Sequence, residues 1–157
     1  VKKEVAINHN EIKGFPEFLV AMSHEYIKRV LPEGLNDKAQ VSFSVWVVSQ
    51  VAGDFNPIHI HDANLSGVAF LKIPPKFEEE YKKEDHHPTV GCLEFLGSVP
   101  NHFARHSYVV KPVVGDFYLF PSWLSHQVYP FRSEGERRSM AFNVHFKLEG
   151  PVKGVNA

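Results

Sequence analysis

Cysteine is almost absent from this sequence, in which Cys92 alone occurs among 157 residues. A single thiol cannot close an internal disulfide, so a disulfide-stapled secreted scaffold is excluded, and we expect a cytoplasmic protein. A surplus of charge is lacking as well, because 17 Lys and Arg stand against 18 Asp and Glu. This balance provides no electrostatic attraction to nucleic acid or to an anionic membrane, and we expect neither as a partner.

Long hydrophobic runs are also missing. No run approaches the roughly 20 apolar residues of a membrane-spanning helix, and the stretch VKKEVAINHN has no apolar segment of signal-peptide length. The chain does have a hydrophobic content of 43% with 22% charged residues, which is typical of a folded globular protein. We expect one domain over residues 1–157.

Apolar residues recur at helical spacing over residues 15–31, with Pro16 in the first turn and Pro32 after the end. After Gly34 the pattern changes to short alternating runs separated by Gly, Pro and Asn. The runs predict strands at residues 41–47, 68–73, 92–99, 107–110, 116–120, 127–131 and 138–148, with an edge strand at 5–7. The charged stretch 76–87 predicts a surface loop, solvated or forming a lid. Together these elements predict a mainly β protein: a double-stranded β-helix (jelly roll) over about residues 41–148, supported by the helix, in preference to an immunoglobulin-like sandwich.

Ten histidines occur, and only His59 and His61 form a His-x-His pair. On a strand, residues i and i+2 face the same side about 6.5 Å apart, so two imidazoles can converge on one metal ion. Two surface histidines after a turn are the alternative. His126 follows an apolar strand and a proline break, which predicts an inward-facing ring. It is either a metal ligand or a core histidine satisfied by hydrogen bonds.

Arg137 and Ser139 share one strand face because they are two residues apart. A guanidinium that points into a barrel needs an anion, and arginine beside a hydroxyl suits a carboxylate. The alternatives are that Arg137 pairs with Glu134 or Glu136, or that Arg138 faces inward. The order His-x-His, His, Arg-x-Ser thus predicts three metal ligands and a carboxylate clamp as neighbours across adjacent strands.

Three stretches carry a resemblance to a known family: HIHDANLSGVAFLKIP, VGDFYLFPSWLSHQVYPF and GERRSMAFNV. They resemble the non-haem Fe(II), 2-oxoglutarate-dependent oxygenases. More narrowly, they are similar to a bacterial and phage subgroup with His-x-His and Phe-Pro-Ser-Trp-Leu-x-His motifs. The resemblance covers about residues 41–146. It implies that His59 and His126 ligate iron and that Arg137 and Ser139 hold the distal carboxylate of 2-oxoglutarate.

The second iron ligand departs from the family pattern. Most members have His-x-Asp or His-x-Glu, whereas here His61 is followed by Asp62. We favour His61, because a regular strand sends Asp62 to the opposite face; a local bulge that brings Asp62 inward is the alternative. Around the iron we expect an apolar shell, formed by Trp46, Phe70, Phe120, Trp123 and Phe142.

The resemblance implies a dioxygenase that uses Fe(II) and 2-oxoglutarate to hydroxylate a C–H bond, with release of succinate and CO2. A prolyl residue of a protein, a small metabolite and a nucleic-acid base are candidate substrates, and residues 76–87 and 100–106 are candidate substrate contacts. Two other readings stay open. One is a cupin-like metal-binding jelly roll of another enzyme class, and the other is a non-enzymatic β binding domain. The sequence does not predict the oligomeric state.

Overall fold

The computed structural model of the protein describes residues 3–31, 40–83, 88–97 and 105–147. The described residues form mainly strands, with one long and one short α-helix. In chain order the elements are β1 (Lys3–Ala6), a 3-10 turn (His9–Glu11), α1 (Phe15–Val30), β2 (Gln40–Gln50), β3 (Asn56–His59), β4 (Leu65–Lys72), α2 (Phe77–Lys83), β5 (Leu93–Leu96), β6 (Ser107–Val110), β7 (Phe117–Pro121), β8 (Ser125–Val128) and β9 (Arg137–Lys147). In this part of the chain, no helix is long and apolar enough to cross a membrane.

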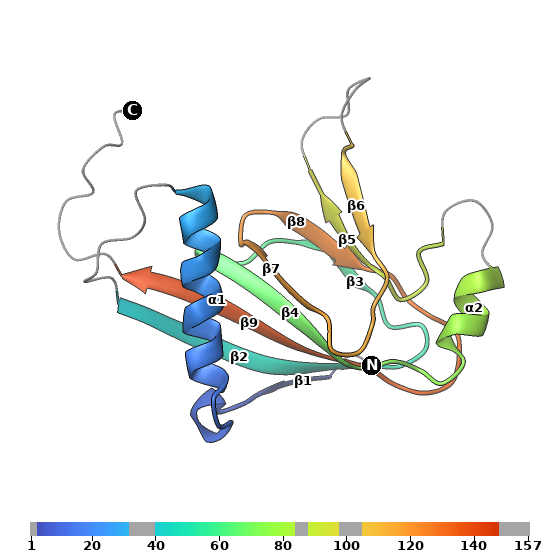
Figure 1. Ribbon diagram of the computed structural model, residues 1–157. Helices are drawn as coiled ribbons and strands as arrows, with labels where there is room; N and C mark the ends of the chain where they lie inside the picture. The colour runs from blue at the N-terminus through green and yellow to red at the C-terminus, as the bar shows by residue number, and fades with distance from the viewer. Residues whose placement is uncertain (1–2, 32–39, 84–87, 98–104, 148–157) are drawn as a thin grey trace.

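The strands form two antiparallel sheets (Figure 1). The larger sheet has the order β1-β2-β9-β4-β7, and the smaller sheet has the order β3-β8-β5-β6. The chain passes from one sheet to the other between β2 and β3, β3 and β4, β4 and β5, β6 and β7, β7 and β8, and β8 and β9. This alternation between two facing sheets is the jelly-roll arrangement, and the expected fold class is confirmed.

Helix α1 packs across one face of the larger sheet, as Figure 1 shows. Its start matches the expectation, with Gly14 in a left-handed conformation at the N-cap and a proline in the first turn. Leu19 is 1% exposed and lies in a cluster with four residues of the sheet, namely Val45, Leu65, Phe142 and Val144. The packing is tight at Gly67, where a Cβ would lie 2.0 Å from Cζ of Phe142. The helix therefore supports the sheet, and the opposite face of that sheet is left to face the smaller one.

The two sheets share a second apolar cluster between them. The larger sheet contributes Phe70 and Phe120, and the smaller sheet contributes Leu93, Phe95, Val110 and Val128. Each such side chain stabilises the fold by about 1.5–3 kcal/mol relative to leaving it in water. This cluster holds the two sheets together.

The expectation for residues 76–87 is wrong over most of its length. Residues 77–83 form α2, and Phe77 is 1% exposed. Phe77 and Tyr81 are four residues apart on one helix face and pack with Val90 and Phe131. The many charged residues around these two aromatic residues are the reason that the sequence predicted a loop and not a helix. The carboxylate of Glu80 accepts hydrogen bonds from two backbone amides that precede β9, at 2.7 Å each. Residues 84–87 lie outside the described residues.

Several strand boundaries also differ from expectation; β4, for example, begins at Leu65 rather than at residue 68. β8 spans Ser125–Val128, so it begins before residue 127 and places His126 inside a strand. The sequence pattern did not predict β3, which ends at His59. Its pairing with β8 shifts register between Asn56 and His59.

Candidate metal and carboxylate site

His59, His61 and His126 come together in the structure. One nitrogen of each ring lies within 4.8 Å of those of the other two, a separation that allows all three to hold one metal ion. His59 and His126 are register partners on β3 and β8. The backbone N–H of His61 donates to the carbonyl of Ser122 at 3.0 Å, which fixes the segment just after β3. Ile60, between the two histidines, is exposed, so both imidazoles point inward as the His-x-His spacing predicts.

Backbone carbonyls orient two of the rings. Nδ1 of His59 lies 2.7 Å from the carbonyl of Pro57, and Nδ1 of His126 lies 2.9 Å from the carbonyl of Leu124. A carbonyl only accepts, so each Nδ1 carries the hydrogen and each neutral ring turns the lone pair of Nε2 away from it. Nε2 of His126 and Nε2 of His61 lie 3.2 Å apart. Two ligands at ~2.1 Å from a metal and at a right angle to each other would lie ~3.0 Å apart, so this pair has the right spacing.

His126 is also in the protonation state that a metal requires. Burial, with smaller contributions from the neighbouring His59 and His61, lowers the pKa of its imidazole from 6.5 to about 4, against the hydrogen bond to Leu124, which raises it. The ring is therefore neutral at physiological pH without any metal. Phe120 packs against it with ring centroids 5.0 Å apart, and Trp46 packs against His61 at 5.8 Å.

Arg137 and Ser139 lie on one face of β9 and are 2% and 3% exposed. Arg138, between them, faces outward and pairs with Glu136 at 2.8 Å, so the alternative of an inward Arg138 is wrong. The guanidinium of Arg137 donates to the carbonyl of Gly91 at 3.1 Å, to Oε1 of Gln50 at 2.7 Å and, at 3.5 Å, to Oγ of Ser139. All three acceptors are neutral, and no salt bridge to Arg137 is found among the described residues. The alternative pairing with Glu134 or Glu136 is therefore also wrong.

Arg137 keeps its charge in this environment. Burial lowers the pKa of the guanidinium to about 10, which still leaves it protonated at neutral pH. The ring of Phe70 lies 5.2 Å from the guanidinium carbon. A buried cation whose hydrogen bonds go to neutral groups is suited to an anionic ligand.

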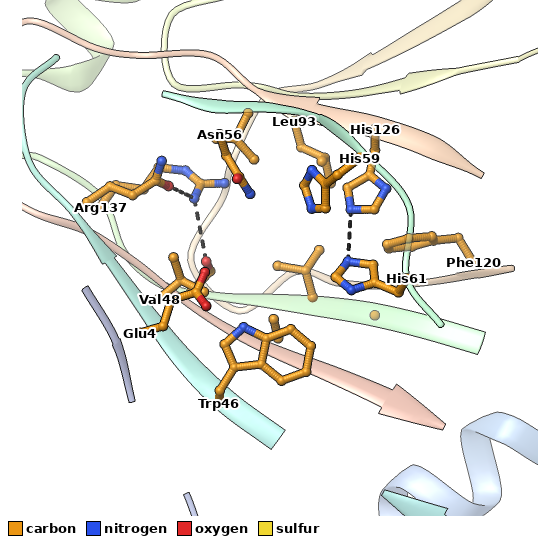
Figure 2. Close-up of a pocket in the computed structure, with 16 residues that line it drawn as sticks. Glu4, Trp46, Val48, Asn56, His59, His61, Leu93, Phe120, His126 and Arg137 are labelled. Atoms are coloured by element: carbon orange, nitrogen blue, oxygen red, sulfur yellow. Dashed lines mark hydrogen bonds between the residues drawn. The ribbon is translucent and has the colours of Figure 1, made fainter. Parts of the chain in front are cut away.

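The histidines and Arg137 line one cavity of about 290 Å³. Figure 2 shows the three imidazoles at one end and Arg137 at the other, with Trp46 and Val48 on one side and Asn56 and Leu93 on the opposite side. His59 and His126 lie on strands of the smaller sheet, His61 lies just after β3, and Arg137 lies on the larger sheet. The expectation of neighbouring sites across adjacent strands is therefore corrected, since the two groups face each other from opposite walls. β8 and β9 are consecutive in the chain but belong to different sheets.

Several expected features of the site differ in the structure. Asp62 is exposed and is not part of the histidine cluster. Trp46 and Phe120 do line the cavity, but Trp123 is 71% exposed and Phe142 packs on the side of α1. Of the candidate substrate contacts, residues 84–87 and 100–104 lie outside the described residues.

Sequence reasoning missed several residues of this site, including Glu4, whose side chain lines the cavity (Figure 2). Gln50 and Asn56 line the cavity, and Gly91 accepts from Arg137 through its carbonyl. Gln50 ends an apolar strand and is the register partner of Arg137, but this pairing is not visible in the sequence. Gly91 lies in a turn with φ of 58°, where an added Cβ would lie 2.7 Å from Phe77. The glycine itself was the one signal in the sequence that could have drawn attention to that turn.

The chain matches the family described as "Putative 2OG-Fe(II) oxygenase" over residues 44–143. The protein belongs to this family, the 2-oxoglutarate- and Fe(II)-dependent oxygenases. It is an oxidoreductase, and the family's metal and cosubstrate are Fe(II) and 2-oxoglutarate, which the three imidazoles and the buried guanidinium of this cavity suit. A search among curated proteins finds no match.

Solved structures share the fold. A prolyl-4-hydroxylase from Pseudomonas putida is 22% identical, with a TM-score of 0.57 over 95% of this chain and 73% of that one. HygX from Streptomyces hygroscopicus, solved with iron bound, is 10% identical, with a TM-score of 0.53 over 90% of this chain and 71% of that one. A prolyl 4-hydroxylase structure from Phytophthora capsici is 19% identical, with a TM-score of 0.52 over 90% of this chain and 47% of that one.

Proposed function

We propose that His59, His61 and His126 ligate Fe(II), and that Arg137 and Ser139 bind the distal carboxylate of 2-oxoglutarate. The observation that carries this proposal is the geometry of one cavity, with three converging imidazoles on one wall and a buried guanidinium on the other. A dicarboxylate held by its far end at Arg137 extends its 2-oxo acid end toward the histidines. One molecule of 2-oxoglutarate then contacts both the iron held by the histidines and the guanidinium of Arg137.

Fe(II), when bound, supplies the activation of dioxygen that turns 2-oxoglutarate into succinate and CO2 and leaves one oxygen atom for a substrate C–H bond. The residues of the chain hold and shield this chemistry. The carbonyls of Pro57 and Leu124 keep the Nε2 lone pairs of His59 and His126 directed inward. Trp46, Leu93 and Phe120 line the cavity with apolar surface and exclude water from it.

His61 is the proposed second ligand, and Asp62 is not. The exposure of Asp62 and the 3.2 Å separation between Nε2 of His61 and Nε2 of His126 both support this choice. With three neutral histidine ligands, the net charge of the iron site is one unit more positive than with two histidines and one carboxylate. We therefore propose that the iron of this protein has a higher reduction potential than a site with a carboxylate ligand.

We propose that the reaction is hydroxylation, and that a prolyl residue of a protein is the substrate to test first. Two of the similar solved structures are prolyl 4-hydroxylases, which motivates that choice. A cupin-like enzyme that needs no cosubstrate would leave the buried charge of Arg137 without a ligand, so Arg137 favours the oxygenase. A cytoplasmic location suits both ferrous iron and the single, buried thiol of Cys92.

An anaerobic titration tests the proposal. The purified protein is loaded with Fe(II), 2-oxoglutarate is added, and the visible charge-transfer band of an iron-chelated 2-oxo acid is recorded. We expect the band to appear and saturate. Iron bound without a band on addition of 2-oxoglutarate would contradict the cosubstrate assignment, and failure to bind Fe(II) would contradict the metal site. Oxygen is then admitted with and without a proline-containing peptide, and succinate and the peptide mass are measured. A gain of 16 mass units, about one oxygen atom, identifies hydroxylation.

A further inference from the structure

Gln50 is a buried amide at the Arg137 end of the cavity. It is the last residue of β2, it is 1% exposed, and it lines the cavity beside its register partner Arg137. The alternation along β2 turns Trp46, Val48 and Gln50 to the cavity face. A polar side chain at this depth must find hydrogen-bond partners or destabilise the fold.

The orientation of this amide is fixed by its neighbour. Nη1 of Arg137 donates to Oε1 of Gln50 at 2.7 Å. A guanidinium has donors only, so the amide cannot turn its NH2 group toward Arg137 without setting two donors against each other. Oε1 therefore faces Arg137, and Nε2 is turned away from it.

Nε2 of Gln50 has no hydrogen-bond partner, and it is one of three such buried side-chain atoms among the described residues. The other two, hydroxyls of Ser23 and Ser133, do not line the cavity. Gln50 thus adds an unsatisfied donor to a wall that already holds the guanidinium of Arg137 and the hydroxyl of Ser139. A carboxylate is the ligand that fits several neighbouring donors, because its two oxygens offer about four lone-pair positions and no hydrogen.

We propose that Gln50 is a third binding residue for the distal carboxylate of the cosubstrate, and that its NH2 group makes the cavity select 2-oxo acids that end in a carboxylate. The inference rests on the proposed function. A 2-oxo acid that ends in a carboxamide would place its NH2 group against one of these donors, and two donors cannot form a hydrogen bond with each other. A short 2-oxo acid such as pyruvate would leave Gln50 as unsatisfied as before.

Two variants separate a direct contact from an indirect one. Gln50→Leu keeps the approximate size and removes the donor, but it also removes the acceptor of Arg137. Gln50→Glu keeps an acceptor for Arg137 and replaces the NH2 donor by an oxygen. Gln40→Leu is the matched control, since Gln40 is the same residue type at the other, exposed end of β2.

The measurement is the dissociation constant of the anaerobic Fe(II) protein for 2-oxoglutarate, for its terminal amide and for pyruvate, from the charge-transfer band. We expect Gln50→Leu to weaken 2-oxoglutarate binding roughly 10- to 100-fold, the effect of one charge-assisted hydrogen bond, and to change pyruvate binding less than about 2-fold. We expect Gln50→Glu to weaken 2-oxoglutarate binding further and to bind the terminal amide more tightly than the wild type does. Gln40→Leu should match the wild type for all three ligands. Fe(II) binding by each variant verifies that the metal end of the cavity is intact.

Each result is decisive. Unchanged 2-oxoglutarate binding in Gln50→Leu, or an equal loss for pyruvate, would overturn the inference. A failure of Gln50→Glu to gain affinity for the amide would also overturn it, because a residue that merely orients Arg137 cannot create a new affinity. If the wild type itself binds Fe(II) but shows no band with 2-oxoglutarate, the proposed function fails and the inference fails with it.

Discussion

Arg137→Met tests whether the buried charge serves a ligand or the fold. The substitution keeps the side-chain length and removes the charge. Burial depresses the pKa of Arg137 from 12.5 to about 10, and a shift of that size corresponds to about 3 kcal/mol. The group is charged at pH 7 in both the folded and unfolded states, so this energy destabilises the wild-type fold throughout the neutral range. Arg137→Met has no buried charge, so this destabilisation of about 3 kcal/mol is absent from the variant.

The substitution also removes stabilising contacts. The carbonyl of Gly91 and Oε1 of Gln50 lose their donor, at a cost of about 1 kcal/mol or more each. The two effects nearly cancel. We therefore expect the free energy of unfolding of unliganded Arg137→Met to lie within about 2 kcal/mol of the wild type, a change of only a few degrees in Tm.

The ligand should distinguish the two proteins clearly. With Fe(II) present and 2-oxoglutarate at about 100 times its Kd, the wild type should gain about 2.7 kcal/mol of stability. Arg137→Met should gain almost none, because loss of a buried charge partner costs about 2–5 kcal/mol of binding. The assay is urea unfolding under anaerobic conditions with and without the ligand.

Arg138→Met is the control for this experiment. Arg138 is the next residue, faces outward and pairs with Glu136, so its removal should change the unfolding free energy by at most about 1 kcal/mol and leave the ligand effect intact. A loss of about 3–5 kcal/mol in unliganded Arg137→Met would refute the reasoning, since that is the cost of breaking a buried ion pair of the fold. An undiminished 2-oxoglutarate effect in Arg137→Met would refute it as well.

Three further predictions concern the metal, pH and α2. His61→Ala should weaken Fe(II) binding by more than about 100-fold in anaerobic titration calorimetry, whereas Asp62→Ala should leave it near the wild-type value. Hydrogen bonds from Arg138, and then from Ser49 and Lys72, lower the pKa of Glu136 from 4.5 to about 2. The carboxylate therefore stabilises the fold above pH 4.5, and this contribution is lost as the pH falls toward 2. In urea unfolding, Glu136→Gln should be less stable than the wild type at pH 7, by a margin that shrinks over that window. Phe77→Ala should destabilise the fold by about 3–5 kcal/mol in the same assay, because Phe77 is 1% exposed.

Each of these predictions has a contrary outcome. A loss of iron in Asp62→Ala equal to that in His61→Ala would contradict the three-histidine site. A stability difference for Glu136→Gln that is constant from pH 7 to 3 would contradict the ionic origin of its contribution. Phe55, which is 48% exposed, is the control for Phe77; equal small effects of Phe55→Ala and Phe77→Ala would indicate that α2 behaves as a solvated segment.

Local patterns were sufficient for the elements whose structure depends on neighbouring residues. The 3.6-residue period predicted α1, and the two-residue period placed Arg137 and Ser139 on one face with Arg138 on the other. It also predicted the inward His59 and His61 and the exposed Asp62, although β3 ends at His59 and the other two residues lie just after it. Local charge misled at residues 77–83, where the i, i+4 pair Phe77 and Tyr81 buries one face of a helix that is charged elsewhere.

By itself the sequence determined the secondary-structure periods, and hence which side chains of a strand share a face. Tertiary structure alone decided which faces meet. β8 and β9 are consecutive in the chain, yet they enter different sheets, so His126 and Arg137 face each other across a cavity. Gln50 reaches Arg137 only because β2 pairs with β9, a contact between segments far apart in the chain. Long-range pairing depends on the packing of the whole core, so no short stretch of sequence carries that information.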